Sequence, residues 1–83
     1  MALKMSCFDY IKSELGVENF IKTYNICNGV VVAFYDIGDT EYQHVGIYED
    51  GYIKHYVNNN YVATVFDSVS RSFDAYDIFI GVK

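Results

Sequence analysis

From Gly29 onward, turn signals divide the sequence into short β-branched and aromatic segments, and none is followed by a segment long enough for a crossover helix. Asp50-Gly51 is the strongest turn signal, because this dipeptide favours the two-residue turns that join antiparallel strands. Parallel strands need a crossover connection, so we expect an antiparallel meander. The predicted strands are residues 30–36, 40–49, 52–57, 61–67 and 73–82. The first is almost wholly apolar and should be covered on both faces.

The segment before these strands, residues 6–25, has the spacing of a helix. Ser6 and Asp9 form a capping-box pattern, and Gly16 is a natural helix stop. We therefore predict one helix bent near Gly16, or two short helices. Apolar residues recur with helical period on both sides of Gly16, namely Phe8, Ile11, Leu15, Val17, Phe20, Ile21 and Tyr24.

The length of 83 residues allows one domain, residues 1–83, and limits how the sheet can be covered. One helical segment cannot cover both faces of a flat five-stranded sheet. A strongly bent sheet closing into a small barrel over residues 29–83, with the helix over one open end, is the economical fold. The fold class is therefore mainly β with an N-terminal helix. Fifteen Tyr and Phe residues and two unpaired edge strands further predict a homo-oligomer.

Charge and cysteine content exclude several classes of protein. The formal charge of −5 argues against bulk attraction to nucleic acid or to an anionic membrane. The chain shows no signal peptide and no apolar run that could span a bilayer, and it has only two cysteines, so a cytoplasmic protein is expected. Asp36, Asp39 and Glu41 cluster at a turn without a calcium-loop pattern, so neither a metal nor a cofactor is predicted.

Three residues could form a catalytic site: Cys7, His44 and His55. A two-residue turn at Asp50-Gly51 places His55 opposite Gly46, so that both imidazoles point to one face as diagonal neighbours. Gly46 should leave open space opposite His55. Cys7 lies near a predicted helix start, where the helix dipole lowers the pKa of a thiol. A thiolate, a histidine base and a group that orients the base are the parts of a papain-like site.

These residues lie in segments that resemble the NlpC-type cysteine peptidases. The similar segments are Gly29-Val30-Val31-Val32-Ala33-Phe34 and His44-Val45-Gly46-Ile47-Tyr48, followed by Gly51 and His55. The resemblance implies Cys7 as nucleophile, His44 as base and His55 as the residue that orients it.

The architecture also resembles the ring-forming Sm/LSm barrels that bind RNA, of phage or bacterial type. The pattern Val30-x-Val32-x-Phe34-x-Asp36, followed by Gly38, is similar to the opening of the first Sm motif. The resemblance implies an SH3-like barrel whose nucleotide pocket is formed by two loops. Asp50 and Tyr52 would come from one loop and Arg71 and Ser72 from the other. Tyr52 could stack on a base and Arg71 could contact a base or phosphate.

Length decides between these two hypotheses. After one helical segment and five strands, no residues remain for the second wall of a peptidase groove. We therefore predict a non-enzymatic, ring-forming Sm-like module that binds RNA or single-stranded DNA and not a membrane. The cysteine hydrolase and a purely structural assembly protein remain alternatives.

Overall fold

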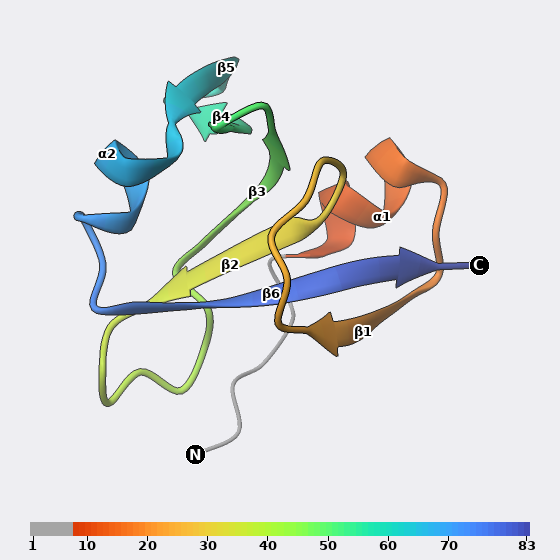
Figure 1. Cartoon of the computed structure of the whole chain (residues 1–83), viewed down its shortest axis with the longest axis horizontal. Coiled ribbons are helices and arrows are strands. Elements are labelled where there is room, and N and C mark those ends of the chain that lie inside the picture. The colour runs from red at the N-terminus through yellow and green to blue at the C-terminus, as the bar shows by residue number, and fades with distance from the viewer. Residues whose placement is uncertain (1–7) are drawn as a thin grey trace.

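The computed structural model describes residues 8–83. Two short helices and six strands follow one another along the chain (Figure 1). In order, they are α1 (Asp9–Leu15), β1 (Asn19–Thr23), β2 (Val31–Tyr35), β3 (His44–Glu49), β4 (Tyr52–Val57), β5 (Asn60–Val65), α2 (Phe66–Ser70) and β6 (Ala75–Val82).

The strands form one antiparallel sheet in the order β1-β6-β2-β3-β4-β5. The mainly β, antiparallel prediction is confirmed, but the number of strands is six and not five. Within residues 8–83, β1 and β5 are the two edges and do not pair with each other, so the sheet is not closed. The prediction of a meander is also wrong, because β6 lies between β1 and β2.

The prediction of a helix over residues 6–25 is wrong beyond Gly16. Gly16 ends α1 with a left-handed φ of 64°, as predicted, but the next apolar set forms β1. β1 pairs with β6, Ile21 standing opposite Ile80, and thereby satisfies the backbone of β6 on that side. α1 starts after Phe8, whose side chain does not cap it, and Asp9 of the predicted capping box lies in its first turn. Ser6 lies outside the described residues.

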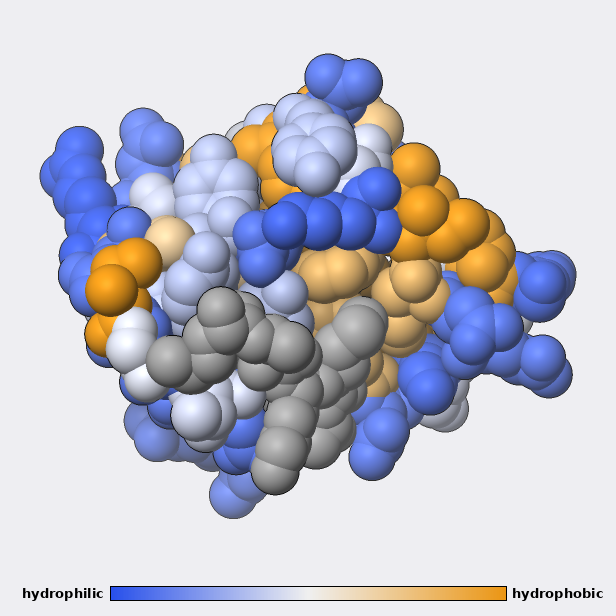
Figure 2. Space-filling view, turned by 90° about the horizontal axis from the view of Figure 1, so that it is seen from below, coloured by the Kyte–Doolittle hydropathy of each residue, from blue (hydrophilic) through white to orange (hydrophobic). Residues whose placement is uncertain are grey.

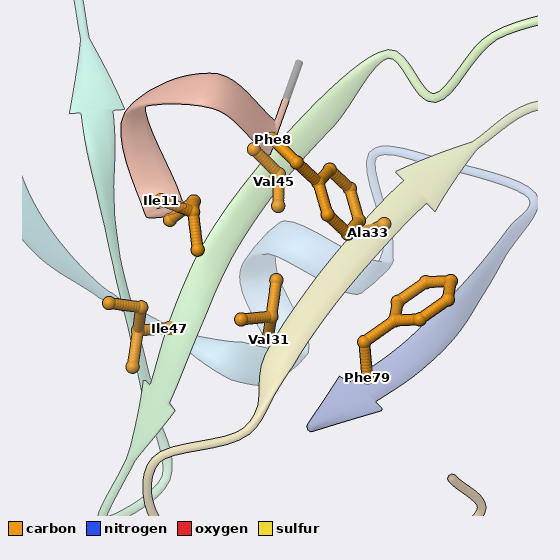
Figure 3. Close-up of a cluster of buried hydrophobic side chains, with 7 residues drawn as sticks. All are labelled: Phe8, Ile11, Val31, Ala33, Val45, Ile47 and Phe79. Atoms are coloured by element: carbon orange, nitrogen blue, oxygen red, sulfur yellow. The ribbon is translucent and has the colours of Figure 1, made fainter. Parts of the chain in front are cut away.

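Alternate residues of β2 face two separate cores. Val31 and Ala33 face α1 and pack with Phe8 and Ile11 (Figure 3). Val32 and Phe34 face the other side, where Val69 of α2 covers them. The expectation that this strand would be covered on both faces is therefore confirmed.

The helix α2 replaces a turn expected after the fourth predicted strand. It carries Val69 into the second core, and Phe66 packs against Phe34 with ring centroids 6.3 Å apart. Because α2 is so short, this burial and not helix propensity stabilises it.

Not all apolar side chains are buried. On the face seen in Figure 2, apolar side chains gather on the side where β1 and the end of β6 lie. Ile21 and Ile80, which stand opposite each other, are 58% and 46% exposed.

Candidate functional site

The β3–β4 hairpin positions the two histidines. Its turn has the predicted two residues, Asp50 and Gly51, both with positive φ. Glu49 stands opposite Tyr52, which is the predicted register. The side-chain amide of Asn28 donates to the Asp50 carboxylate at 2.9 Å and accepts from the Asp50 backbone N–H at 2.8 Å. These bonds fix the turn, and the turn fixes the register on which both imidazoles depend.

A hydrogen-bonded chain of three side chains runs across β3, β4 and β5. Nε2 of His44 shares a hydrogen bond with Nδ1 of His55, and the ring centroids are 4.8 Å apart. Nε2 of His55 lies 2.8 Å from Oγ1 of Thr64. The prediction that both imidazoles lie on one face as neighbours is confirmed.

Gly46 allows this approach. A Cβ added to Gly46 would lie 2.4 Å from Cγ2 of Ile53, 2.9 Å from the carbonyl oxygen of Lys54 and 3.1 Å from Cβ of His55. The predicted open space opposite His55 is therefore wrong. The side chains of β4 occupy the volume that a larger residue would need.

The histidines are held in apolar surroundings. His55 is 4% exposed, and the ring of His44 stacks on Phe73 with an interplanar angle of 6° and centroids 6.1 Å apart. Burial lowers the pKa of His44 below its ordinary value of 6.5, and the nearby His55 lowers it further. Burial also lowers the pKa of His55. Both imidazoles are therefore neutral at pH 7, the form in which a ring nitrogen can accept a proton.

The chain of three opens onto a hollow of about 310 Å³ beside α2. Its polar lining consists of the two histidines and the hydroxyls of Thr64, Ser68 and Ser72, and its apolar lining consists of Val57, Val69 and Phe73. A second hollow of about 330 Å³ lies beside His44 and is lined by Tyr10, Gln43, Val45 and Tyr56. His44 therefore borders two separate concave surfaces, one of which includes the first turn of α1.

The proposed nucleotide-binding residues flank α2. Asp50 and Tyr52 belong to the β3–β4 turn, which lies next to the first residue of α2. There the Phe66 N–H donates to the Gly51 carbonyl at 2.9 Å. Arg71 and Ser72 follow its last turn, and both are exposed. Among the described residues no side-chain hydrogen bond or ion pair joins the two pairs.

Cys7, the candidate nucleophile, lies outside the described residues. Thr64 is not among the predicted site residues, because the predicted strands 52–57 and 61–67 leave a three-residue turn between them. The turn is Asn58-Asn59, both with positive φ, and Asn60 already pairs with Val57. The pattern Asn-Asn between two β segments could have given this register. Val62 then falls opposite His55, and Thr64, two residues on, falls on the same face.

Within residues 8–83, no group of three or more His, Cys, Asp or Glu side chains is placed to hold a metal ion. No helix in this part of the chain is long and apolar enough to cross a membrane. Comparisons with protein-family models, with curated proteins and with solved structures find no match to this chain.

Proposed function

We propose that this protein is a cysteine hydrolase that cleaves an amide or ester bond, with His44 as its general base. The observation that carries the proposal is the hydrogen-bonded chain from His44 through His55 to Thr64. A base needs a fixed ring orientation and a defined tautomer, and a second polar group normally supplies both.

We assign the direction of the hydrogen bonds from the role proposed for His44, because only one direction leaves a ring nitrogen of His44 able to accept a proton. In that direction His44 donates from Nε2 to Nδ1 of His55, and His55 donates from Nε2 to the Thr64 hydroxyl oxygen. Nδ1 of His44 is then unprotonated. This nitrogen has no hydrogen-bond partner among residues 8–83. Every buried side-chain nitrogen in these residues has a partner, so Nδ1 of His44 is not buried. This nitrogen is the base of the proposed site.

Cys7, whose predicted place is near a helix start, is the nucleophile. Its S–H proton passes to Nδ1 of His44, and the sulfur bonds to the substrate carbonyl carbon. The C–N or C–O bond breaks, and the leaving group takes the proton from the imidazolium. Water then gives a proton to His44 and its oxygen bonds to the acyl carbon. The C–S bond breaks, and the thiolate regains the proton.

The test is the pH dependence of Cys7 alkylation in a Cys27→Ser background, where Cys7 is the single remaining thiol. Because His44 is neutral at pH 7 and takes the proton as the sulfur reacts, we expect alkylation at pH 7 to be faster than that of an ordinary thiol, whose pKa is about 8.5. The rate should fall as the pH drops and His44 becomes protonated, and His44→Gln should slow alkylation to the rate of an ordinary thiol. Lys54→Gln, on the opposite face of the same hairpin, is the matched control and should change nothing. An alkylation rate no faster than that of an ordinary thiol, and unchanged by His44→Gln, would overturn the proposal.

The Sm-like module, a small barrel that binds nucleic acid, is a second candidate, favoured by the position of two loops. Asp50 and Tyr52 at one end of α2, and Arg71 and Ser72 at its other end, are the two loops this hypothesis requires. Tyr52 is 46% exposed and free to stack on a base. The test is fluorescence anisotropy with a single-stranded RNA oligonucleotide. Arg71→Ala should weaken binding, while Lys83→Ala should have a smaller effect. No binding by the unmodified chain would reject this candidate.

A further inference from the structure

The edge strand β5 carries none of the features that normally prevent edge strands from pairing. Its sequence, Asn60-Tyr-Val-Ala-Thr-Val65, contains no charged residue and no proline. The other edge strand, β1, carries Lys22, which forms an ion pair with Asp77 at 3.4 Å. Natural proteins use charges, prolines or bulges to keep edge strands from pairing with other chains. β5 is therefore the edge through which a second chain can extend this sheet.

The hairpin register shows which backbone groups of β5 have no partner among residues 8–83. The two-residue turn makes Val57 and Asn60 a hydrogen-bonded pair, and bonded pairs then alternate along the strands. The bond from the Phe66 N–H to the Gly51 carbonyl continues this alternation. Asn60, Val62 and Thr64 therefore bond to β4. Tyr61, Ala63 and Val65 direct their N–H and C=O groups away from the sheet.

We propose that β5 pairs antiparallel with β5 of a second copy, about a twofold axis through Ala63. Tyr61, Ala63 and Val65 are evenly spaced, so their outward N–H and C=O groups can pair with the same three residues of an antiparallel copy. Ala63 then stands opposite Ala63 of the other copy, and Tyr61 stands opposite Val65. Each of these pairs exchanges two hydrogen bonds, so three pairs give six bonds. A shift of two residues toward Asn60 would lose one pair, because its partner would fall in the Asn58-Asn59 turn.

Side chains on both faces of the hairpin support this partner. Tyr61 follows Tyr56 and Tyr10 in a row of ring contacts, with centroids 4.9 Å and 5.2 Å apart. The small side chain of Ala63 at the twofold axis lets the flanking larger residues meet. The exposed apolar residues of β4 and β5, each 38–49% exposed, are Tyr52, Tyr56, Val57, Tyr61, Val62 and Val65.

The surface available is close to what a dimer requires. With 150–250 Å² for a fully exposed aromatic side chain, these residues expose roughly 400–500 Å² per copy. Two copies together expose roughly 800–1,000 Å² there, at or just below the lower limit of about 1,000 Å² for a specific interface. Near this edge Lys54 and Glu49 pair at 2.8 Å, and Glu14 adds a negative charge close to Tyr61.

The test is the mass in solution by multi-angle light scattering over a series of protein concentrations. We expect a mass tending to twice the 9.5 kDa of one chain. Ala63→Glu places two like charges opposite each other and should return the chain to the monomer mass. Ile21→Glu, at an exposed position on the other edge strand, is the matched control and should leave the dimer intact.

A crosslink tests the register independently. In a Cys7→Ser/Cys27→Ser background, Ala63→Cys should join two chains through a short bis-thiol reagent, because directly opposed residues lie about 5.5 Å apart. Tyr61→Cys should not, since the two sulfurs would be about 14 Å apart along the strands, four residue rises of about 3.4 Å. A monomer at all concentrations would overturn the proposal. So would a dimer or larger ring that Ala63→Glu leaves intact and Ile21→Glu breaks.

Discussion

Replacing Gly46 by alanine tests whether close packing at this position holds the two histidines together. The added methyl group would meet Cγ2 of Ile53 at 2.4 Å and the backbone carbonyl oxygen of Lys54 at 2.9 Å. The Ile53 side chain is fully buried, so it has little room to turn away. The carbonyl belongs to the β3–β4 ladder, so it cannot move without disturbing the register. The easiest relief is to move β4, which carries His55 away from His44.

The size of the effect follows from two opposing contributions. Forcing a methyl group into a packed core costs about 1–3 kcal/mol, and contact with backbone points to the upper end of this range. Alanine restricts the unfolded chain more than glycine does, which returns roughly 0.5–1 kcal/mol. The net loss in the free energy of unfolding is therefore about 2 kcal/mol. A chain of this length has a total of roughly 4–12 kcal/mol, so the loss is a substantial part of it.

Urea unfolding followed by far-ultraviolet circular dichroism measures this loss. Gly81→Ala is the matched control, because the three atoms nearest to its added methyl group all belong to the side chain of Val17, with Cγ2 at 2.9 Å. Val17 is half-buried in the connection before β1 and can shift, so we expect the control to lose less than about 1 kcal/mol. Equal stability of Gly46→Ala and the unmodified chain would refute the packing argument. Gly81→Ala as unstable as Gly46→Ala would refute it as well.

Three further predictions concern pH, the second core and the hairpin turn. His44 and His55 are the only histidines, and folding lowers the pKa of both, so the unfolded chain binds more protons than the folded chain. Their contribution to the free energy of unfolding should be complete above pH 6.5, and the free energy should fall as the pH drops below that value. Replacing both histidines by Gln should flatten this pH dependence in urea titrations. Phe34→Ala, at a fully buried position, should cost about 3–5 kcal/mol, whereas Phe34→Leu should cost much less; equal losses in thermal melts would contradict the core assignment. Asn28→Ala removes both bonds to Asp50 and should lower stability by about 0.5–1.5 kcal/mol, with Asn25→Ala as an exposed control.

The parts of the fold that follow from local chemistry were predictable from the sequence. Asp50-Gly51 fixed a two-residue turn, and from that turn the register and the shared face of His44 and His55 followed by counting. Gly16 likewise ended α1 with the expected left-handed backbone.

The failures come from contacts between distant segments. The segment around Phe20 and Ile21 has helical spacing, yet it is a strand because β6 offers it an unpaired backbone. That partner lies nearly sixty residues away in the sequence, so the local pattern does not predict the pairing. Residues 66–70 are helical because Val69 and Phe66 find the second core, which is also a tertiary effect. The place of Thr64 beside His55 was not predicted because the predicted turn is one residue too long. A shift of one residue in the register moves a side chain to the other face of the sheet.

The position of β6 in the sheet has a consequence for how the chain reaches its fold during translation. β2 to β5 are consecutive neighbours, so a nascent chain can assemble them as each strand emerges. β1 emerges before all of these strands but has no partner until residues 75–82 have been made. Until then the backbone of β1 and the outer edge of β2 both remain unpaired. A nascent chain stalled before Ala75 would therefore expose two unpaired strand edges at once. We expect such a chain to bind chaperones and to aggregate more readily than one in which β6 has been made.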